Sequence, residues 1–138
     1  MLPTIKAVGV PQAFRLLRDI AGRAGDASPA WDAVADDVFA FQRKFWLMAY
    51  GGVADKDQRA GRNPRHMVES GGLHASATRR GASRQRVKIN GSYLLIEVTH
   101  GLGVLHEARG REVLGTPGAR EAGKYAEKVA GFILTGSV

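Results

Sequence analysis

The stretch RQRVKINGSYLLIEVTH, residues 84–100, predicts a β-hairpin, and this hairpin decides the fold class. At its centre, Asn90 and Gly91 are a strong signal for a two-residue type I′ turn, because both residue types tolerate the positive φ that this turn requires. A turn at these positions fixes which residues of the two strands lie opposite each other. The expected cross-strand pairs are Val87 with Leu94, Arg86 with Leu95, and Arg84 with Glu97.

The alternation of side chains gives the predicted hairpin one apolar face and one basic face. The apolar face, as a half-buried strand pair requires, holds Val87, Ile89, Leu94, Ile96 and Val98. The opposite face holds Arg84, Arg86, Lys88, Tyr93 and Glu97. We therefore expect the basic face to be available to a partner.

The composition is that of one modest domain. The 138 residues, 44% of them hydrophobic, fit a single domain spanning 1–138. No apolar run has the length of a membrane helix, and the first residues lack the charged start and apolar stretch of a secretory signal. The chain has no cysteine, so packing or oligomerisation must supply its stability. We expect assembly in the cytoplasm and no membrane partner.

Most of the formal net charge of +7 comes from the middle of the chain. Residues 51–90 hold nine Lys and Arg against three acids, whereas the segments before and after are nearly balanced. The first part of this block, at about 51–72, shows neither helical nor strand periodicity, and we predict a long basic loop there. Such a block faces phosphates, an acidic protein surface or water, and charge alone leaves these alternatives open.

Two amphipathic helices are expected before the hairpin. Pro11 suits the first helical position, and Phe14, Leu17 and Ile20 then recur at helical spacing until Gly25. Ser28 can cap a second helix, with Pro29 at its first position. Its apolar stripe, which we interpret as a core face, comprises Trp31, Val34, Val38, Phe41, Phe45 and Met48. Phe39 and Trp46 form a second apolar edge of this helix, either core or a contact surface for a neighbouring subunit.

One more helix is expected at the end of the chain. Thr116 and Pro117 can open it, and its predicted buried face comprises Ala122, Ala126, Val129 and Ile133. Residues 73–78 are compatible with a strand or a helical turn, while 100–103 and 109–118 are expected to be a turn and a loop. The order predicts an α+β fold, in which a small antiparallel β-sheet with a β-hairpin packs against two N-terminal helices and one C-terminal helix.

The sequence contains no convincing catalytic or metal-binding pattern. His100 and His106, with Glu107, flank a glycine-rich turn, but neither a helical His-x-x-x-His spacing nor a cysteine supports a zinc site. A nucleophile elbow and a phosphate-binding glycine loop are both absent. We therefore predict no catalytic residues, no metal and no cofactor.

Two short stretches flank the predicted hairpin: SGGLHAS at 70–76 and VLHEARG at 104–110. They resemble the tail-completion and neck proteins of long-tailed bacteriophages, the phage virion morphogenesis group. In that family a Thr/Ser-Gly-x-Leu-x-x-Ser stretch precedes a strand pair, and a segment of the kind Tyr-Ala-x-x-His-x-x-Gly follows it. The N-terminal helix pair, which ends in the aromatic run FQRKFW at 41–46, is also similar to the beginning of that family.

This resemblance implies a structural virion protein that forms a ring, most often six-fold, at the head-tail junction. Such a ring stops growth of the tail tube and helps to join the tail to the head. The partners would be further copies of the chain, neighbouring neck or connector and tail-tube proteins, and packaged DNA in the lumen. The alternative function is a small basic nucleic-acid-binding protein, which the charge block at 51–90 favours.

Two sets of residues are the candidate sites. The set expected to face the DNA channel or a partner comprises Arg59, Arg62, Arg65, Arg79, Arg80, Arg84, Arg86 and Lys88. The set expected at a subunit interface comprises Phe39, Trp46, Tyr93 and Leu95.

Overall fold

The computed structural model describes residues 9–50, 72–108, 110 and 112–138. The predicted loop at 51–72, with Arg59, Arg62 and Arg65, lies outside them except for its last residue. The elements are α1 (Val10–Gly25), α2 (Ser28–Tyr50), α4 (Gly72–Thr78), β1 (Gln85–Ile89), β2 (Leu94–Val98), α5 (Gly101–Ala108) and α6 (Ala119–Thr135). These helices and the two-stranded antiparallel sheet confirm the α+β class.

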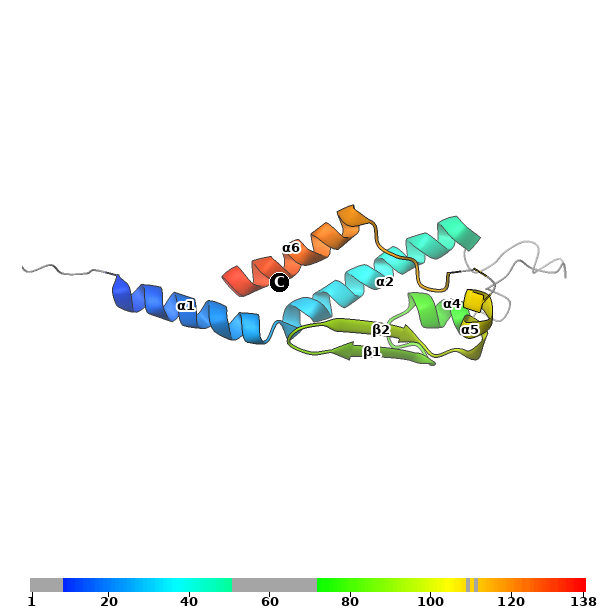
Figure 1. Cartoon of the computed structure of the whole chain (residues 1–138), viewed down its shortest axis with the longest axis horizontal. Helices are drawn as coiled ribbons and strands as arrows, with labels where there is room; N and C mark the ends of the chain where they lie inside the picture. The colour runs from blue at the N-terminus through cyan, green and yellow to red at the C-terminus, as the bar shows by residue number, and fades with distance from the viewer. Residues whose placement is uncertain (1–8, 51–71, 109, 111) are drawn as a thin grey trace, which may run out of the picture.

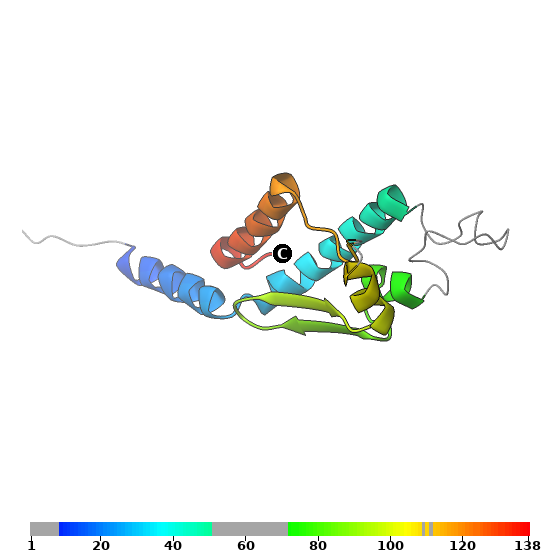
Figure 2. The same cartoon turned by 45° about the vertical axis from the view of Figure 1, so that its right-hand side comes forward.

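Helix α2 is the spine of the fold. The hairpin and α4 pack on one side of α2, and α6 packs on another (Figures 1 and 2). Helix α1 leads away from the body as an arm and contacts α6 near its C-terminal end. Arg23 of α1 makes this contact by donating to the carbonyl oxygens of Ile133, at 2.8 Å, and Leu134, at 3.0 Å.

The buried side chains form two clusters. The first surrounds Trp46, whose Nε1 donates to the carbonyl oxygen of Val113 at 2.9 Å, and it includes Leu73 and Ala77. The second lies where α1, α2 and α6 meet, and it includes Ala27, Ala30 and Phe132. Because aromatic side chains bury the most apolar area, Trp46 and Phe39, both fully buried, contribute most to the hydrophobic stabilisation of α2.

The hairpin forms, but with a longer loop than the sequence predicts. The last pair of the ladder is Ile89 with Leu94, which leaves a four-residue loop. Neither Asn90 nor Gly91 has a positive φ, so the predicted type I′ turn is wrong. Instead, the side-chain oxygen of Asn90 accepts from the backbone N–H of Ser92, at 2.8 Å, and of Tyr93, at 3.1 Å. Hydrogen bonds from backbone N–H groups to the side chain of an asparagine two or three residues earlier are typical of turns.

The longer loop shifts the register by two residues. The observed pairs are Gln85 with Val98, Arg86 with Glu97, Val87 with Ile96, Lys88 with Leu95 and Ile89 with Leu94. They replace the predicted pairs of Val87 with Leu94, Arg86 with Leu95 and Arg84 with Glu97. Since side chains alternate with a period of two, a two-residue shift keeps the residues of the ladder on their predicted faces, while Arg84 and Tyr93 lie just outside the ladder. The apolar and basic faces are therefore confirmed, although the pairing is not.

Gly91 is needed for packing rather than for its backbone angle. A Cβ atom at this position would lie 2.6 Å from the carbonyl oxygen of Gly25. The carbonyl oxygen of Gly91 also accepts from the backbone N–H of Ala27 at 3.0 Å. The tip of the hairpin thus docks against the junction between α1 and α2.

Several helix predictions need correction. Met48 is 87% exposed, whereas Phe39 and Trp46 are buried, so the core face of α2 is rotated from the predicted stripe towards the second apolar edge. The predicted subunit-interface role of Phe39 and Trp46 is therefore wrong, and the core alternative holds. Residues 101–108, expected to be a turn and a short apolar piece, form α5, whose first turn is capped by Nδ1 of His100 accepting from the Leu102 N–H at 3.2 Å.

Helix α6 differs in its start and its buried face. It begins at Ala119, with Gly118 as the N-cap, rather than at Thr116. Ala122 and Ala126 are exposed, whereas Val129 and Ile133 pack, as predicted, against the cluster that contains the buried Phe132. The alanines recur at helical spacing and were therefore included in the predicted buried face. The larger Phe132 buries more apolar area, so the side of α6 that carries Phe132 packs on the core.

Candidate partner-facing surfaces

The loop between α4 and β1 carries three arginines and is held in place by polar side chains. Gln85 bridges it, because its Nε2 donates to the carbonyl oxygen of Arg79 at 3.1 Å and its Oε1 accepts from the Gly81 N–H at 3.0 Å. Ser76, buried on α4, donates its hydroxyl to the carbonyl oxygen of Ser83 at 2.8 Å. We call residues 79–84 the arginine loop. Its shape is fixed by these bonds, so its arginines are presented from a defined backbone.

Arg84 ends this loop in an unusual conformation. Its φ of 57° lies in the left-handed region, which non-glycine residues adopt only at a cost. The carbonyl oxygen of Arg84 accepts from the backbone N–H of Thr99 at 2.7 Å, which ties the start of β1 to the end of β2. An arginine is thus held at the entrance of the hairpin by backbone contacts.

The predicted basic residues do not all behave alike. Arg80 binds Asp36 at 2.9 Å and also Asp32, both on α2, and these carboxylates raise the pKa of its guanidinium. Arg80 therefore holds the loop against α2, although its side chain remains exposed. Arg79 is also exposed, but it forms no ion pair within the described part of the chain.

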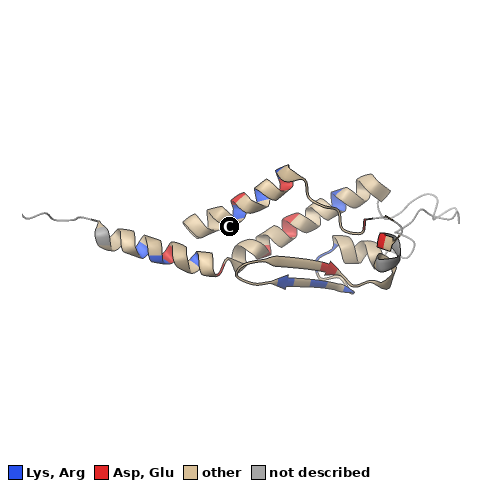
Figure 3. Cartoon of the chain, viewed as in Figure 1, with Lys and Arg blue, Asp and Glu red and all other residues tan. Residues whose placement is uncertain are grey.

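The outer face of the hairpin brings the remaining basic residues together. Arg84 and Lys88 are exposed and without an ion pair among the described residues, and Arg86 pairs with Glu97 at 3.1 Å across the strands. Figure 3 shows this row of basic residues along β1. Tyr93 and Leu95 are 40% and 39% exposed, so two of the four predicted interface residues are available to a partner.

Helix α1 presents an apolar face that nothing in the described structure covers. Its period places Phe14, Leu17, Ala21 and Ala24 along one stripe, and Phe14 and Leu17 are 65% and 61% exposed. The opposite side carries Arg15 and Asp19, and Arg18 lies at the edge of the stripe, between Phe14 and Ala21. The sequence predicted this amphipathic helix, but only the structure shows that its apolar stripe is left open to solvent. We call these four residues the α1 stripe.

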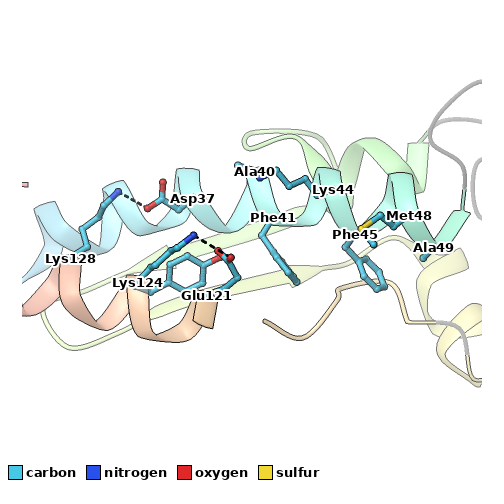
Figure 4. A pocket seen from close by; sticks show the side chains of 11 residues that line it. Asp37, Ala40, Phe41, Lys44, Phe45, Met48, Ala49, Glu121, Lys124 and Lys128 are labelled. Carbon is cyan, nitrogen blue, oxygen red and sulfur yellow. Dashed lines mark hydrogen bonds and ion pairs between the residues drawn. The ribbon is translucent and has the colours of Figure 1, made fainter. Parts of the chain in front are cut away.

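A groove of about 810 Å³ lies between the C-terminal half of α2 and the N-terminal half of α6 (Figure 4). Phe41, Phe45 and Met48 line its α2 wall, and Tyr125 lies on the α6 wall. Its rim is charged, since Asp37 pairs with Lys128 across the groove and Glu121 pairs with Lys124 at 3.4 Å. Sequence periodicity marked the phenylalanines as a stripe, but it could not show that they lie half-buried beside an open groove.

The phenol of Tyr125 is the one buried side-chain polar atom in the described residues without a hydrogen-bond partner. Burial raises the pKa of this phenol, and the carboxylates of Glu121 and Asp37 raise it further. Unpaired buried polar groups are rare in folded proteins because each loses its contact with water. The groove therefore offers a polar group as well as an apolar wall.

The histidines serve structural positions where they are described. His74 is buried on α4, with its ring edge-on to Trp46 at 5.2 Å, and burial lowers its pKa. His66 lies outside the described residues. No three His, Asp or Glu side chains in the described ranges are placed to hold a metal ion, and no described helix has the length and apolar character needed to cross a membrane.

Comparisons with models of protein families, with curated proteins and with solved structures find no match to this chain. Its function must therefore be argued from the surfaces described above.

Proposed function

We propose that this chain is a structural protein of a tailed phage that forms a ring at the head-tail junction, completing the tail and joining it to the head. Its partners are further copies of itself and the neck and tail-tube proteins above and below it. The role requires neither a cofactor nor catalysis. The resemblance of SGGLHAS and VLHEARG to the tail-completion and neck family is the origin of the proposal.

One observation carries the proposal: the chain has two different, well-separated apolar surfaces. The α1 stripe lies on an arm at one end of the molecule, and the groove beside Phe45 and Met48 lies towards the other end of α2. A closed ring needs a heterologous contact, in which one patch of each subunit meets a different patch of the next. A symmetric dimer would need only one self-complementary patch.

The small core is consistent with stabilisation by assembly. Phe14 and Leu17, one helical turn apart on α1, are 65% and 61% exposed, in addition to single exposed residues such as Leu47 and Leu95. Contiguous exposed apolar surface on a soluble protein is typical of interaction sites. Burial of these side chains between subunits would add the hydrophobic stabilisation that one copy lacks.

The basic face of the hairpin suits a surface that meets phosphates without reading sequence. Arg84 and Lys88 are exposed, and Arg and Lys side chains commonly contact phosphate oxygens, which carry no sequence information. Attraction of this kind would favour passage of any DNA sequence through a lumen. An acidic neighbouring ring would meet the same surface equally well.

The proposal is tested first by the mass of the purified chain in solution. Light scattering across concentration and salt should show closed oligomers of the 14.8 kDa chain, with rings visible by electron microscopy. Antibody labelling of tailed virions should then place the protein at the head-tail junction. A chain that stays monomeric at high concentration, and that is absent from virion rings, would contradict the proposal.

The rigid arginine loop favours a second candidate, a small nucleic-acid-binding protein. In that case the monomer should bind DNA, and the logarithm of its affinity should fall by about 0.9 per phosphate contact for each tenfold rise in salt. The outer face offers only Tyr93 as an aromatic group, so stacking of several bases is not expected. Weak binding of monomers to DNA would favour the ring.

A further inference from the structure

We infer that the α1 stripe of one copy lies in the groove between α2 and α6 of the next copy. The inference rests on the proposed ring, and it names the two surfaces that meet. It places Phe14 and Leu17 of one subunit against Phe41, Phe45 and Met48 of its neighbour.

The stripe and the groove have matching chemistry. The stripe is apolar along its length, Arg15 and Asp19 lie on the opposite side of the helix, and Arg18 lies at the edge of the stripe. The groove has an apolar wall, and its rim carries positive and negative charges from the ion pairs of Asp37 with Lys128 and Glu121 with Lys124. An amphipathic helix in such a groove buries its apolar face and leaves its charged side at the rim.

The two surfaces cannot meet within one chain as it is folded. Arg23 ties the end of α1 to the last turn of α6, through Ile133 and Leu134. The groove begins at the other end of α6, beside Glu121, and continues along the far half of α2. Helix α1 points away from both of these regions (Figures 1 and 2). A second copy is therefore needed to bring an α1 stripe to the groove.

The size of the contact is reasonable for one interface of a ring. The 16 residues of α1 span about 24 Å, and the groove-facing half of a helix about 10 Å wide has a surface on the order of 400 Å². Stable interfaces bury about 800 Å² per partner. The helix thus supplies about half of that area, and contacts beside it would supply the rest. Each subunit of a closed ring has two such contacts, one through each surface.

A second copy explains more of the structure than other occupants do. An anionic membrane surface would cover the α1 stripe, since α1 has arginines on its polar side, but it would leave the groove empty. A separate small apolar ligand would fill the groove but leave Phe14 and Leu17 exposed. Docking of α1 covers both surfaces at once.

The absence of cysteine makes a direct test simple. Two single variants, Leu17→Cys and Met48→Cys, are mixed and treated with a short bifunctional thiol cross-linker. Both side chains are exposed, so neither change should alter the fold. We expect a cross-linked dimer of the two variants. The matched control, Arg15→Cys mixed with Met48→Cys, should form much less of this product because Arg15 lies on the opposite side of α1.

A second variant measures the energetic contribution of the stripe. Leu17→Asp should raise the dissociation constant for self-association by about thirty-fold or more, as expected for a central interface residue, with an unchanged circular dichroism spectrum. Leu102→Asp, a matched change at an exposed leucine of α5, should leave the association unchanged.

The outcomes separate this inference from the proposed ring. Rings that form without the Leu17 to Met48 cross-link, and that tolerate Leu17→Asp, would overturn the inference and leave the ring intact. A chain that neither self-associates nor cross-links at any concentration, with or without virion partners, would overturn both. Binding of the wild-type monomer to anionic vesicles that Leu17→Asp abolishes, without any cross-link, would assign α1 to a membrane surface instead.

Discussion

The side chain of Gln42 and the backbone of Gly115, 73 positions apart, hold each other through two hydrogen bonds of 2.9 Å. Nε2 of Gln42 donates to the Gly115 carbonyl oxygen, and Oε1 accepts from the Gly115 N–H. All these atoms are buried, so the pair fixes the segment before α6 against the middle of α2. A Cβ atom at Gly115 would lie 2.5 Å from the ring of Phe45, so no larger residue fits there without movement.

Replacement of Gln42 should therefore destabilise the fold strongly. Gln42→Leu keeps a side chain of similar size but leaves the buried N–H and C=O of Gly115 without partners, which costs about 1 to 3 kcal/mol for each group. For the two groups together, we expect the free energy of unfolding to fall by about 2 to 6 kcal/mol, measured by urea denaturation. The matched change Gln12→Leu, on the exposed arm, should have little effect. Equal stability of the two variants would contradict the buried pair.

Two glycines should respond to alanine in opposite directions. At Gly91 an added Cβ would lie 2.6 Å from a backbone oxygen of Gly25, so Gly91→Ala should lower stability by about 1 to 3 kcal/mol, as overpacking does. Gly123 lies inside α6 with no atom within 4 Å of its Cβ position, and alanine there should raise stability by about 0.5 to 1 kcal/mol. Thermal unfolding of both variants measures the difference. A stabilising Gly91→Ala would show that the hairpin tip does not dock on the α1–α2 junction.

His74 should make the stability depend on pH. Burial lowers the pKa of this imidazole in the folded chain, and the charge of Arg79 lowers it further. The unfolded chain therefore takes up a proton first as the pH falls, so stability is fully present above about pH 6.5 and is lost on acidification through the folded pKa. We expect the urea concentration at the midpoint of unfolding to decrease as the pH is lowered from 7.5 to 5.5. His74→Gln should reduce this fall, and an equal fall in the wild-type chain and in His74→Gln would contradict the assignment.

The sequence was sufficient for the fold class but not for the packing of its surfaces. Alternation along the strands predicted the two faces of the hairpin correctly, because a period of two depends on local geometry alone. The predicted turn type was wrong because the Asn90 side chain closes a four-residue loop. Gly91 is required there by its close approach to Gly25, not by a positive φ. That contact joins parts of the chain far apart in sequence, so no local signal reveals it.

The candidate site was less predictable for the same reason. Arg79 and Arg80 are neighbours of identical type, yet Arg80 binds Asp32 and Asp36, while Arg79 has no ion pair among the described residues. Likewise, Phe39 and Met48 are both apolar residues of α2, yet Phe39 is buried and Met48 is exposed. The difference depends on which elements pack against each side of the helix. Hydrophobic period identifies an amphipathic helix, but it does not say which apolar residues a neighbouring element covers.

The basic outer face of the hairpin should be dispensable for folding. We would replace Arg84, Arg86 and Lys88 together by Asn, Gln and Gln, since asparagine tolerates the positive φ at position 84. The ion pair of Arg86 with Glu97 is exposed, and such pairs contribute at most about 1 kcal/mol. The melting temperature should therefore change by only a few degrees.

The same triple variant should bind phosphates less well. If the three side chains face DNA, the assembled protein should lose affinity for DNA of any sequence, and its salt dependence should weaken by about 0.9 in slope for each contact removed. Arg80→Gln is the matched control, because Arg80 is already bound to two carboxylates. Equal losses in the triple variant and in Arg80→Gln would show that total charge, not the hairpin face, attracts the DNA. An unchanged slope with weakened ring assembly would instead assign the face to an acidic protein neighbour.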